Sequence, residues 1–234
     1  MSDRSFVSPE MRARVRVVAV PVALLLGRLG LTPNALTIVG FLGTCLAAIA
    51  AASQAWVLAG LLVIAFGIFD LFDGALARAT NRVSRVGAFL DSVFDRAGES
   101  MLYVGIAIGC LAGGTINPTF DLGAILAAAA MAASFMVSYT RAKSESLGFT
   151  PGTGMANVGL APREVRLVVV TLGLVSTGVL GGVQTQSRFV VDSAWYGGRG
   201  ALAATLGLIT VLATITTIQR IVHVIRQSSS KEHE

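Results

Sequence analysis

The stretch AWVLAGLLVIAFGIFDLFDGALARA, residues 55–79, places two aspartates, Asp70 and Asp73, at the end of a long apolar run. A helix of about 20 apolar residues is long enough to cross a hydrocarbon core about 30 Å thick. An ionised carboxylate inside such a helix is unfavourable unless it is paired, so intramembrane acids usually mark a metal, proton or substrate site. The stretch therefore predicts a transmembrane helix that carries part of a functional site.

The composition of the whole chain agrees with a membrane protein. Of its 234 residues, 54% are hydrophobic and 13% are charged, and the charged share is about half of that usual in soluble domains. This balance argues against an ordinary soluble globule, a disordered chain and a nucleic-acid-binding domain. Cys45 and Cys110 both lie inside apolar runs, so neither a disulfide framework nor a zinc site is expected.

Further apolar runs of similar length extend this prediction to the whole fold. We expect an all-α polytopic membrane protein with six transmembrane helices and an N-terminal interfacial amphipathic helix. The six spans are expected at residues 33–53, 55–79, 84–112, 120–147, 164–184 and 195–225. The N-terminal helix covers 9–30, where Arg12, Arg14 and Arg16 alternate with apolar residues, a pattern that suits the membrane surface. The chain then divides into a cytoplasmic N-terminus with this juxtamembrane helix at 1–32, the membrane domain at 33–226 and a cytoplasmic tail at 227–234.

The basic residues predict the orientation, because cytoplasmic loops of membrane proteins are enriched in lysine and arginine. With six spans, most basic residues fall on one side of the membrane, and the other side carries only Arg188 and Arg199. The basic side carries Arg4, Arg12, Arg14, Arg16, Arg28, Arg78, Arg82, Arg85, Arg141, Lys143, Arg163, Arg166, Arg220, Arg226 and Lys231. We therefore expect a multi-pass protein of the cell membrane with both termini, the acidic residues and the 148–162 loop on the cytoplasmic side.

A cluster of acids connects the second and third expected spans. Asp70 and Asp73 are three residues apart, and Asp91 and Asp95 are four apart, so each pair lies on one helix face. A hairpin at 81–84 can bring the two pairs opposite one another. Four carboxylates in one place repel one another strongly unless a divalent cation lies between them, and Mg²⁺ or Mn²⁺ prefers such oxygen ligands. The cluster therefore predicts a divalent metal site.

Small residues lie beside these acids at helical spacing. Gly74 and Ala77 follow the first pair of acids by one turn, and Gly87 precedes the second pair by one turn. Their missing side chains leave room for a ligand next to the metals. Arg78, one turn after Gly74, adds a guanidinium whose forked geometry suits a phosphate group.

The complete pattern, Asp70-x-x-Asp73-Gly74-x-x-Ala77-Arg78 followed by Gly87-x-x-x-Asp91-x-x-x-Asp95, resembles the signature of the CDP-alcohol phosphotransferase family. The resemblance covers most of the chain, because six spans, a short N-terminal interfacial helix and an acidic site on a hairpin are also features of that family. It implies a transferase that moves the substituted phosphate group of a CDP-linked lipid to an alcohol, with release of CMP. It also implies two Mg²⁺ or Mn²⁺ ions in each active site and a homodimer.

By matched position, the resemblance assigns a role to each motif residue. Asp70, Asp73 and Asp91 would hold the two metal ions, and Asp95 would complete the second site and act as the catalytic proton acceptor. The CDP-linked lipid would be contacted by Gly74, Arg78 and Ser84, and by the stretch Asn34-Ala35-Leu36-Thr37 at the start of the first span.

Basic residues further along the chain indicate the acceptor. Arg141 and Lys143 precede the 148–162 loop, and Arg163 and Arg166 follow it. Four cations favour a phosphorylated acceptor over serine or free inositol, although positive-inside anchoring is the alternative. Their pattern resembles the phosphatidylinositol phosphate synthase branch of the family, which implies inositol phosphate as the acceptor. Glycerol 3-phosphate is the alternative acceptor, with phosphatidylglycerophosphate as product, and the donor would be CDP-diacylglycerol or a CDP-linked archaeal lipid.

Two interpretations lie outside this enzyme class. A divalent-cation or proton-coupled transporter also uses intramembrane acids, but its acids are expected near the bilayer midplane and not beside a basic hairpin. A structural protein whose acids only pair with arginines does not explain the small residues at helical spacing. Simple ion pairing is nevertheless the plain expectation for Glu99 and Arg82. Membrane lipids are expected partners, and nucleic acid is not.

Overall fold

The computed structural model describes residues 9–112, 122–149, 158–181 and 193–231. These residues form helices joined by turns, with no β-strand among them, so the all-α prediction is confirmed. In chain order the helices are α1 (Pro9–Arg28), α2 (Pro33–Ala52), α3 (Trp56–Gly67), α4 (Phe69–Ala79), α5 (Arg85–Ala112), α6 (Leu122–Ser146), α7 (Arg163–Leu180) and α8 (Ser193–Lys231).

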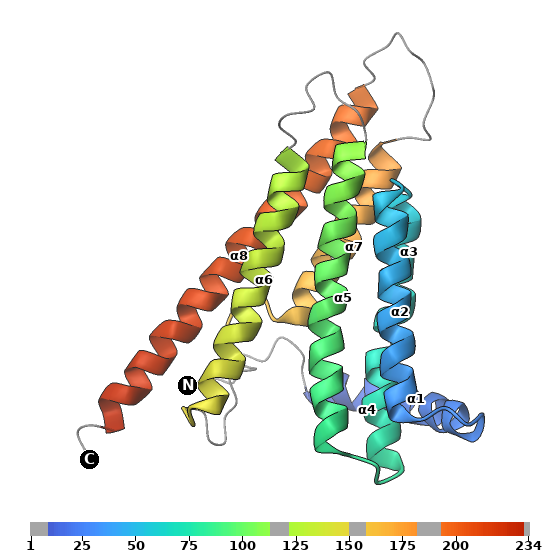
Figure 1. Cartoon of the computed structure of the whole chain (residues 1–234), viewed down its shortest axis with the longest axis vertical. Helices are drawn as coiled ribbons and strands as arrows, with labels where there is room; N and C mark the ends of the chain where they lie inside the picture. Colours follow the sequence, from blue (N-terminus) through green and yellow to red (C-terminus); the bar gives the residue numbers. More distant parts are fainter. Residues whose placement is uncertain (1–8, 113–121, 150–157, 182–192, 232–234) are drawn as a thin grey trace.

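The helices form a bundle with one helix across its end. Figure 1 shows α2, α3, α5, α6, α7 and α8 side by side along the long axis, whereas α1 lies across one end beside α4. Ala19 and Ala23 of α1 pack against Ala75 and Leu76 of α4 there. This end, which also holds the 80–84 turn between α4 and α5, is called the acidic end below. The α7 helix begins partway along the bundle, deeper than the nearby ends of α5 and α6.

Four helical segments of the described residues are long and apolar enough to cross a membrane: Pro33–Ala52, Trp56–Ala79, Leu122–Ser146 and Gly198–Ser229. The chain is therefore an integral membrane protein. The other two expected spans are helical, as α5 and α7, but neither meets this criterion. The reason is chemical, because α5 carries Asp91, Asp95 and Glu99 and α7 begins with Arg163 and other charged residues.

The helix limits differ from the expected spans in three places. The span expected at 55–79 is divided at Ile68, although the backbone of Ile68 stays α-helical, with φ −68° and ψ −26°. The α7 helix ends at Leu180, before the expected limit of 184, and residues from 182 to 192 lie outside the described part of the chain. The α8 helix continues to Lys231, beyond the expected limit of 225, because residues 226–231 contain neither glycine nor proline to end it.

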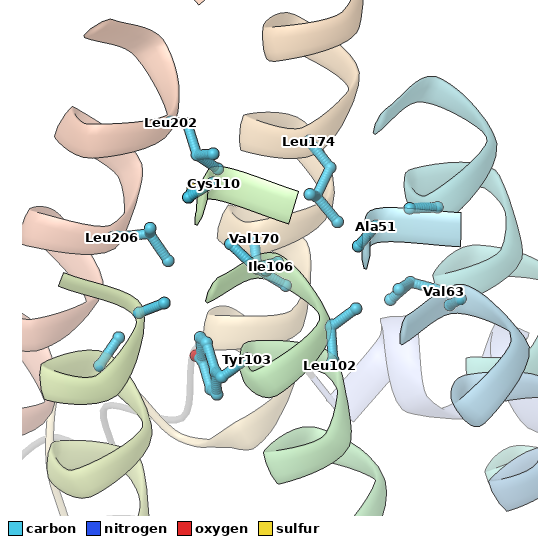
Figure 2. Close-up of a cluster of buried hydrophobic side chains, with 14 of the residues drawn as sticks. Ala51, Val63, Leu102, Tyr103, Ile106, Cys110, Val170, Leu174, Leu202 and Leu206 are labelled. Atoms are coloured by element: carbon cyan, nitrogen blue, oxygen red, sulfur yellow. The ribbon is translucent and has the colours of Figure 1, made fainter. Parts of the chain in front are cut away.

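The apolar core lies between the helices in the half of the bundle away from the acidic end. Figure 2 shows Leu102 and Ile106 of α5 among side chains of the neighbouring helices, including Val63, Val170 and Leu174. Glycines bring α5 close to α2, because a Cβ at position 105 or 109 would overlap a backbone carbonyl oxygen of α2. Small residues at such an interface are a common means of close helix packing in membranes. The core thus fixes α5 against α2, and α5 carries two of the site aspartates.

Candidate metal and substrate site

Three of the predicted metal ligands come together at the acidic end. Asp70 lies in the first turn of α4, and Asp91 and Asp95 lie on successive turns of α5. Each offers a carboxylate oxygen, and these oxygens all lie within 4.8 Å of one another. Carboxylates at this separation repel one another, and a donor set made only of carboxylate oxygens fits a hard divalent cation such as Mg²⁺ or Mn²⁺. The residues present therefore fit a divalent metal ion.

Asp73, the fourth predicted ligand, is not part of this group of three carboxylates. Its side chain is buried and accepts a hydrogen bond of 2.6 Å from Thr37 Oγ1 of α2. The structure thus connects a predicted metal ligand with a predicted contact of the CDP-linked lipid. A direct role of Asp73 in metal binding stays a prediction.

Two arginines contact the carboxylate group. Arg163 Nη1, at the first residue of α7, lies 2.6 Å from Asp70 Oδ2 and 2.9 Å from Asp95 Oδ1. Arg96 Nη1 lies 3.1 Å from Asp95 Oδ2. Arg96 directly follows Asp95 in the sequence, so their pairing is local. Arg163 was predicted to bind the acceptor, because 93 positions separate it from Asp70 and no local spacing indicates their contact. The cations offset part of the repulsion between the carboxylates.

Next to Asp95 the structure contains a cavity of about 130 Å³ with a strongly basic lining. Five arginines contribute to the lining, namely Arg96, Arg141, Arg163, Arg166 and Arg220, together with the acids Asp95 and Glu164. Three of the four predicted acceptor residues are therefore at this cavity, and Lys143 is not among the residues that line it. A cavity with this lining suits a compact, multiply charged anion such as a phosphate monoester.

Arg220 is the cavity residue that the sequence indicated least. It lies deep in α8, is buried, and donates hydrogen bonds to the carbonyl oxygens of Val158, at 2.9 Å, and of Val137. Its position inside an apolar helix is the signal that could have identified it, since a buried cation in a membrane segment usually has a specific partner or function. The sequence treats it only as one of many residues on the basic side.

Arg166, predicted to bind the acceptor, is almost fully buried and forms an ion pair with Glu99 of α5. The expectation of simple ion pairing for Glu99 is met in the structure. Lys143 and Arg141 lie on α6, where Arg141 forms an exposed pair with Glu145 at 2.9 Å. The four predicted acceptor cations thus have three different environments. Arg163 contacts the site carboxylates, Arg166 belongs to a buried ion pair, and the other two lie on the exposed end of α6.

The predicted lipid-donor residues lie around the start of α5 and along α4. A Cβ at Gly87 would come within 3.0 Å of Ser84 Oγ and 3.2 Å of Asn34 Oδ1, so these three residues are neighbours. Ser84 Oγ also accepts a hydrogen bond of 2.9 Å from the Gly87 backbone N–H. On α4, the Arg78 guanidinium folds over Gly74, where a Cβ would lie 3.2 Å from Arg78 Nη1. Both glycines therefore allow a polar side chain to approach the helix backbone closely, and room for a ligand beside them stays a prediction.

The predicted stretch Asn34-Ala35-Leu36-Thr37 is the first turn of α2. Thr32 caps this helix, accepting a hydrogen bond of 3.2 Å from the Ala35 backbone N–H. Leu36 is fully buried against α1 and α4, so its side chain packs helices together in this arrangement. Asn34 and Thr37 are the members of the stretch whose polar groups lie beside other site residues.

A larger cavity, of about 340 Å³, lies at the opposite end of the bundle, near Trp56, Thr177 and Arg199. No carboxylate is among the described residues that line it. It therefore offers no carboxylate ligand for a metal among these residues, and the combination of carboxylates and arginines at the acidic end is the stronger candidate for chemistry.

Comparison with known proteins agrees with this site. The sequence profile of the CDP-alcohol phosphatidyltransferase family matches residues 30–228. The archaetidylinositol phosphate synthase of Pyrococcus horikoshii is 35% identical over 174 residues, which cover 74% of this chain and 85% of the relative. The phosphatidylinositol phosphate synthase of Streptomyces avermitilis is 33% identical over 222 residues, which cover 94% of this chain and 83% of the relative.

Solved structures show the same fold. The crystal structure of Mycobacterium tuberculosis phosphatidylinositol phosphate synthase with CDP-DAG bound matches with a TM-score of 0.70 and 26% identity, over 88% of this chain and 93% of that chain. A second crystal structure of that protein, in complex with manganese and citrate, matches with a TM-score of 0.69 and 27% identity, over 88% of both chains.

Proposed function

Because the chain belongs to the CDP-alcohol phosphatidyltransferase family, we propose that it transfers a phosphatidyl or archaetidyl group from a CDP-linked lipid to inositol phosphate. In this reaction an acceptor hydroxyl oxygen forms a bond to the lipid-side phosphorus, and the bond from that phosphorus to CMP breaks. The observation that carries the proposal is the contact between the three-carboxylate group and the arginine-lined cavity, with Asp95 belonging to both.

Asp95 is the proposed proton acceptor because of this shared position. A group that takes the proton from the attacking hydroxyl must lie within reach of both the acceptor and the pyrophosphate. Asp95 lines the cavity, and one of its oxygens lies close to those of Asp70 and Asp91. Arg96 and Arg163 contact its two oxygens and orient the carboxylate.

Asp70, Asp91 and Asp95 would hold divalent metal, with Asp73 as a further ligand of a two-ion site. Bound Mg²⁺ or Mn²⁺ would polarise the pyrophosphate and stabilise negative charge on the departing CMP. The relative whose crystal structure contains manganese supports a divalent metal here. The chain's own contribution is to hold carboxylates from two helices within 4.8 Å of one another.

The donor would bind along α4 and the start of α5. Gly74 and Gly87 leave room for the CDP group, Arg78 would pair with phosphate, and Ser84 and Asn34 would offer polar contacts. The relative with bound CDP-DAG supports this class of donor. The first turn of α2, including Ala35, Leu36 and Thr37, would form the wall beside it.

The acceptor would bind in the basic cavity with its phosphate toward Arg141, Arg163 and neighbouring arginines. Five arginines in the lining favour a phosphate dianion over a neutral polyol such as inositol. The names of the relatives favour inositol phosphate over glycerol 3-phosphate. Glycerol 3-phosphate remains the second candidate because it carries the same charged group.

We also propose that α5 and α7 cross the membrane together with the four apolar segments, and that α1 lies at the membrane surface. The basic residues at the acidic end, among them Arg78, Arg82 and Arg85, favour a cytoplasmic location for this end. The protein would form a homodimer, as the family resemblance implies.

The test is release of CMP by the purified protein in detergent. Each of two donors, CDP-diacylglycerol and a CDP-linked archaeal lipid, is combined with Mg²⁺ or Mn²⁺ and with inositol phosphate, glycerol 3-phosphate, serine, inositol or no acceptor. Release that depends on inositol phosphate supports the proposal, and release with glycerol 3-phosphate alone assigns the second acceptor. If a folded sample releases no CMP with either donor, metal uptake into proteoliposomes would test the transporter interpretation.

A further inference from the structure

A buried ion pair lies one helical turn from the residues of the site. Glu99 is one turn after Asp95 on α5, and Arg166 is one turn after Arg163 on α7. Arg166 Nε and Nη2 donate to the two oxygens of Glu99, both at 2.8 Å. Only 6% of Glu99 and 1% of Arg166 is exposed. A buried, bidentate ion pair of this kind fixes the position of α7 relative to α5. Separating the pair would leave two buried charges without partners.

The same arginine also holds the segment that leads into α7. Arg166 Nη1 donates to the carbonyl oxygen of Ala161 at 3.0 Å. The backbone N–H groups of Leu160 and Ala161 in turn donate to Thr216 Oγ1 of α8, at 3.1 and 2.9 Å. The beginning of α7 is therefore held from α5 on one side and from α8 on the other. Arg163 is the first residue of the helix that begins at this point.

From these contacts we propose that Glu99 is a positioning residue for the transfer reaction. Through Arg166 it fixes the start of α7, so that Arg163 lies across Asp70 and Asp95 and forms one wall of the basic cavity. The kinetic part of this inference rests on the proposed function.

The pair is distinct from the three-carboxylate group, because Glu99 is not one of its members and both of its oxygens accept hydrogen bonds from Arg166. Arg166 also belongs to the lining of the basic cavity. Each of the three guanidinium nitrogens of Arg166 already donates to Glu99 or Ala161. Arg163 has a different environment, because its Nη1 contacts the site carboxylates directly. The two predicted acceptor arginines both line the cavity, but Arg163 contacts the site carboxylates, whereas the contacts of Arg166 hold the start of α7.

The kinetic test uses Glu99→Gln, which keeps the size of the side chain and removes its charge. Partners that orient site residues typically change affinity or activity by about 10- to 100-fold, so we expect the KM for inositol phosphate to rise about 10-fold or more. The KM for the CDP-linked lipid should change far less, since the donor residues lie on α4 and at the start of α5. Arg166→Lys, which keeps the charge but loses the forked contact, should show the same split.

The outcome that overturns the inference is equally specific. If Arg166 itself binds the acceptor phosphate, Glu99→Gln releases its guanidinium and the acceptor KM stays unchanged or falls. If Glu99 only stabilises the fold, the two KM values and kcat deteriorate together.

A thermal-unfolding cycle tests the positioning without any turnover. Glu99→Gln, Arg163→Gln and the double variant are compared with the unmodified protein in detergent. If the ion pairs of Arg163 depend on Glu99, the drop in Tm of the double variant is smaller than the sum of the two single drops. Additive drops overturn the inference. If the unmodified protein releases no CMP with any acceptor, the proposed function fails, while this cycle still reports on the role of Glu99.

Discussion

Thr37 Oγ1 of α2 donates a hydrogen bond of 2.6 Å to Asp73 Oδ2 of α4, and both side chains are buried. This contact joins the first turn of α2, which is proposed to meet the CDP-linked lipid, to an acid that is proposed to bind metal. Asp73 is not part of the group formed by Asp70, Asp91 and Asp95. The orientation of the Asp73 carboxylate therefore depends on a residue 36 positions earlier in the chain.

We predict that Thr37→Val lowers kcat/KM for the CDP-linked lipid. Valine has nearly the same shape, but it leaves the buried Asp73 carboxylate without this donor. A hydrogen bond to a charged group contributes about 1.5–3 kcal/mol, which corresponds to a decrease of roughly 10-fold or more. The measurement is CMP release as the donor concentration varies at saturating acceptor and metal. Thr37→Ser restores the hydroxyl and should recover most of the activity, and a serine variant as poor as the valine variant would argue against this role.

A second prediction concerns Asp95, which belongs both to the carboxylate group and to the lining of the basic cavity. Replacement by Asn preserves the shape but removes the proton acceptor, and general bases typically contribute about 10²- to 10⁴-fold. We therefore expect kcat to fall by at least about 100-fold at saturating Mg²⁺, donor and acceptor. Size-exclusion chromatography in detergent controls for folding. Turnover near the original rate in Asp95→Asn would exclude it as the base.

Metal dependence provides a third prediction. Asp70→Asn or Asp91→Asn removes one negative ligand from the three-carboxylate group, so more metal is required for the same occupancy. We expect the Mn²⁺ concentration for half-maximal activity to rise by roughly 10-fold or more, and chelation by EDTA to stop CMP release until metal is restored. Titrating Mn²⁺ against the rate for each variant measures the effect. A titration curve identical to that of the unmodified protein would contradict the assignment of these two ligands.

Contacts of the site could be predicted from the sequence only where the two residues lie close together along the chain. The spacings of Asp70 with Asp73 and of Asp91 with Asp95 are local, and helix geometry with the hairpin at 81–84 predicted one group of four acids, of which the structure brings three together and leaves Asp73 apart. The ion pairs of Arg163 with Asp70 and of Arg166 with Glu99 join residues 93 and 67 positions apart. Nothing in the helical periodicity indicates which helices are neighbours, so these contacts required the three-dimensional structure.

The fold shows the same limit. Apolar runs predicted a helical membrane protein, and the expected start of the first span at residue 33 agrees with the start of α2 at Pro33. Charged residues of α5 and α7 lie at the candidate site, and because of these charges the two helices do not stand out as apolar spans. Charged site residues thus lower the hydropathy by which a membrane-spanning helix is recognised.

A fourth prediction compares two basic residues of α6, of which only one lines the basic cavity. Arg141 lines the cavity and Lys143 does not, although the sequence treats them alike. Because Arg141 is half exposed, we expect Arg141→Gln to raise the KM for inositol phosphate by roughly 3- to 10-fold with little change in the donor KM. Lys143→Gln removes the same charge two residues later and should have a clearly smaller effect. Equal effects of the two substitutions would favour a general role in positive-inside anchoring.

The last prediction concerns the contact between α2 and α5, the helix on which Asp91 and Asp95 lie. A Cβ at Gly105 would overlap the backbone carbonyl of Ala48 on α2, whereas a Cβ at Gly207 of α8 would meet no atom within 4 Å. Overpacking a tight contact costs about 1–3 kcal/mol, so Gly105→Ala should lower the Tm in detergent by roughly 3–10 °C. Gly207→Ala is the matched control and should leave the Tm unchanged or raise it, since alanine is the better helix former by about 1 kcal/mol. Because α2 also carries Thr37, separation of α5 from α2 in Gly105→Ala should reduce CMP release at temperatures below its Tm. A Gly105→Ala variant as stable and active as Gly207→Ala would show that α2 and α5 do not pack this closely.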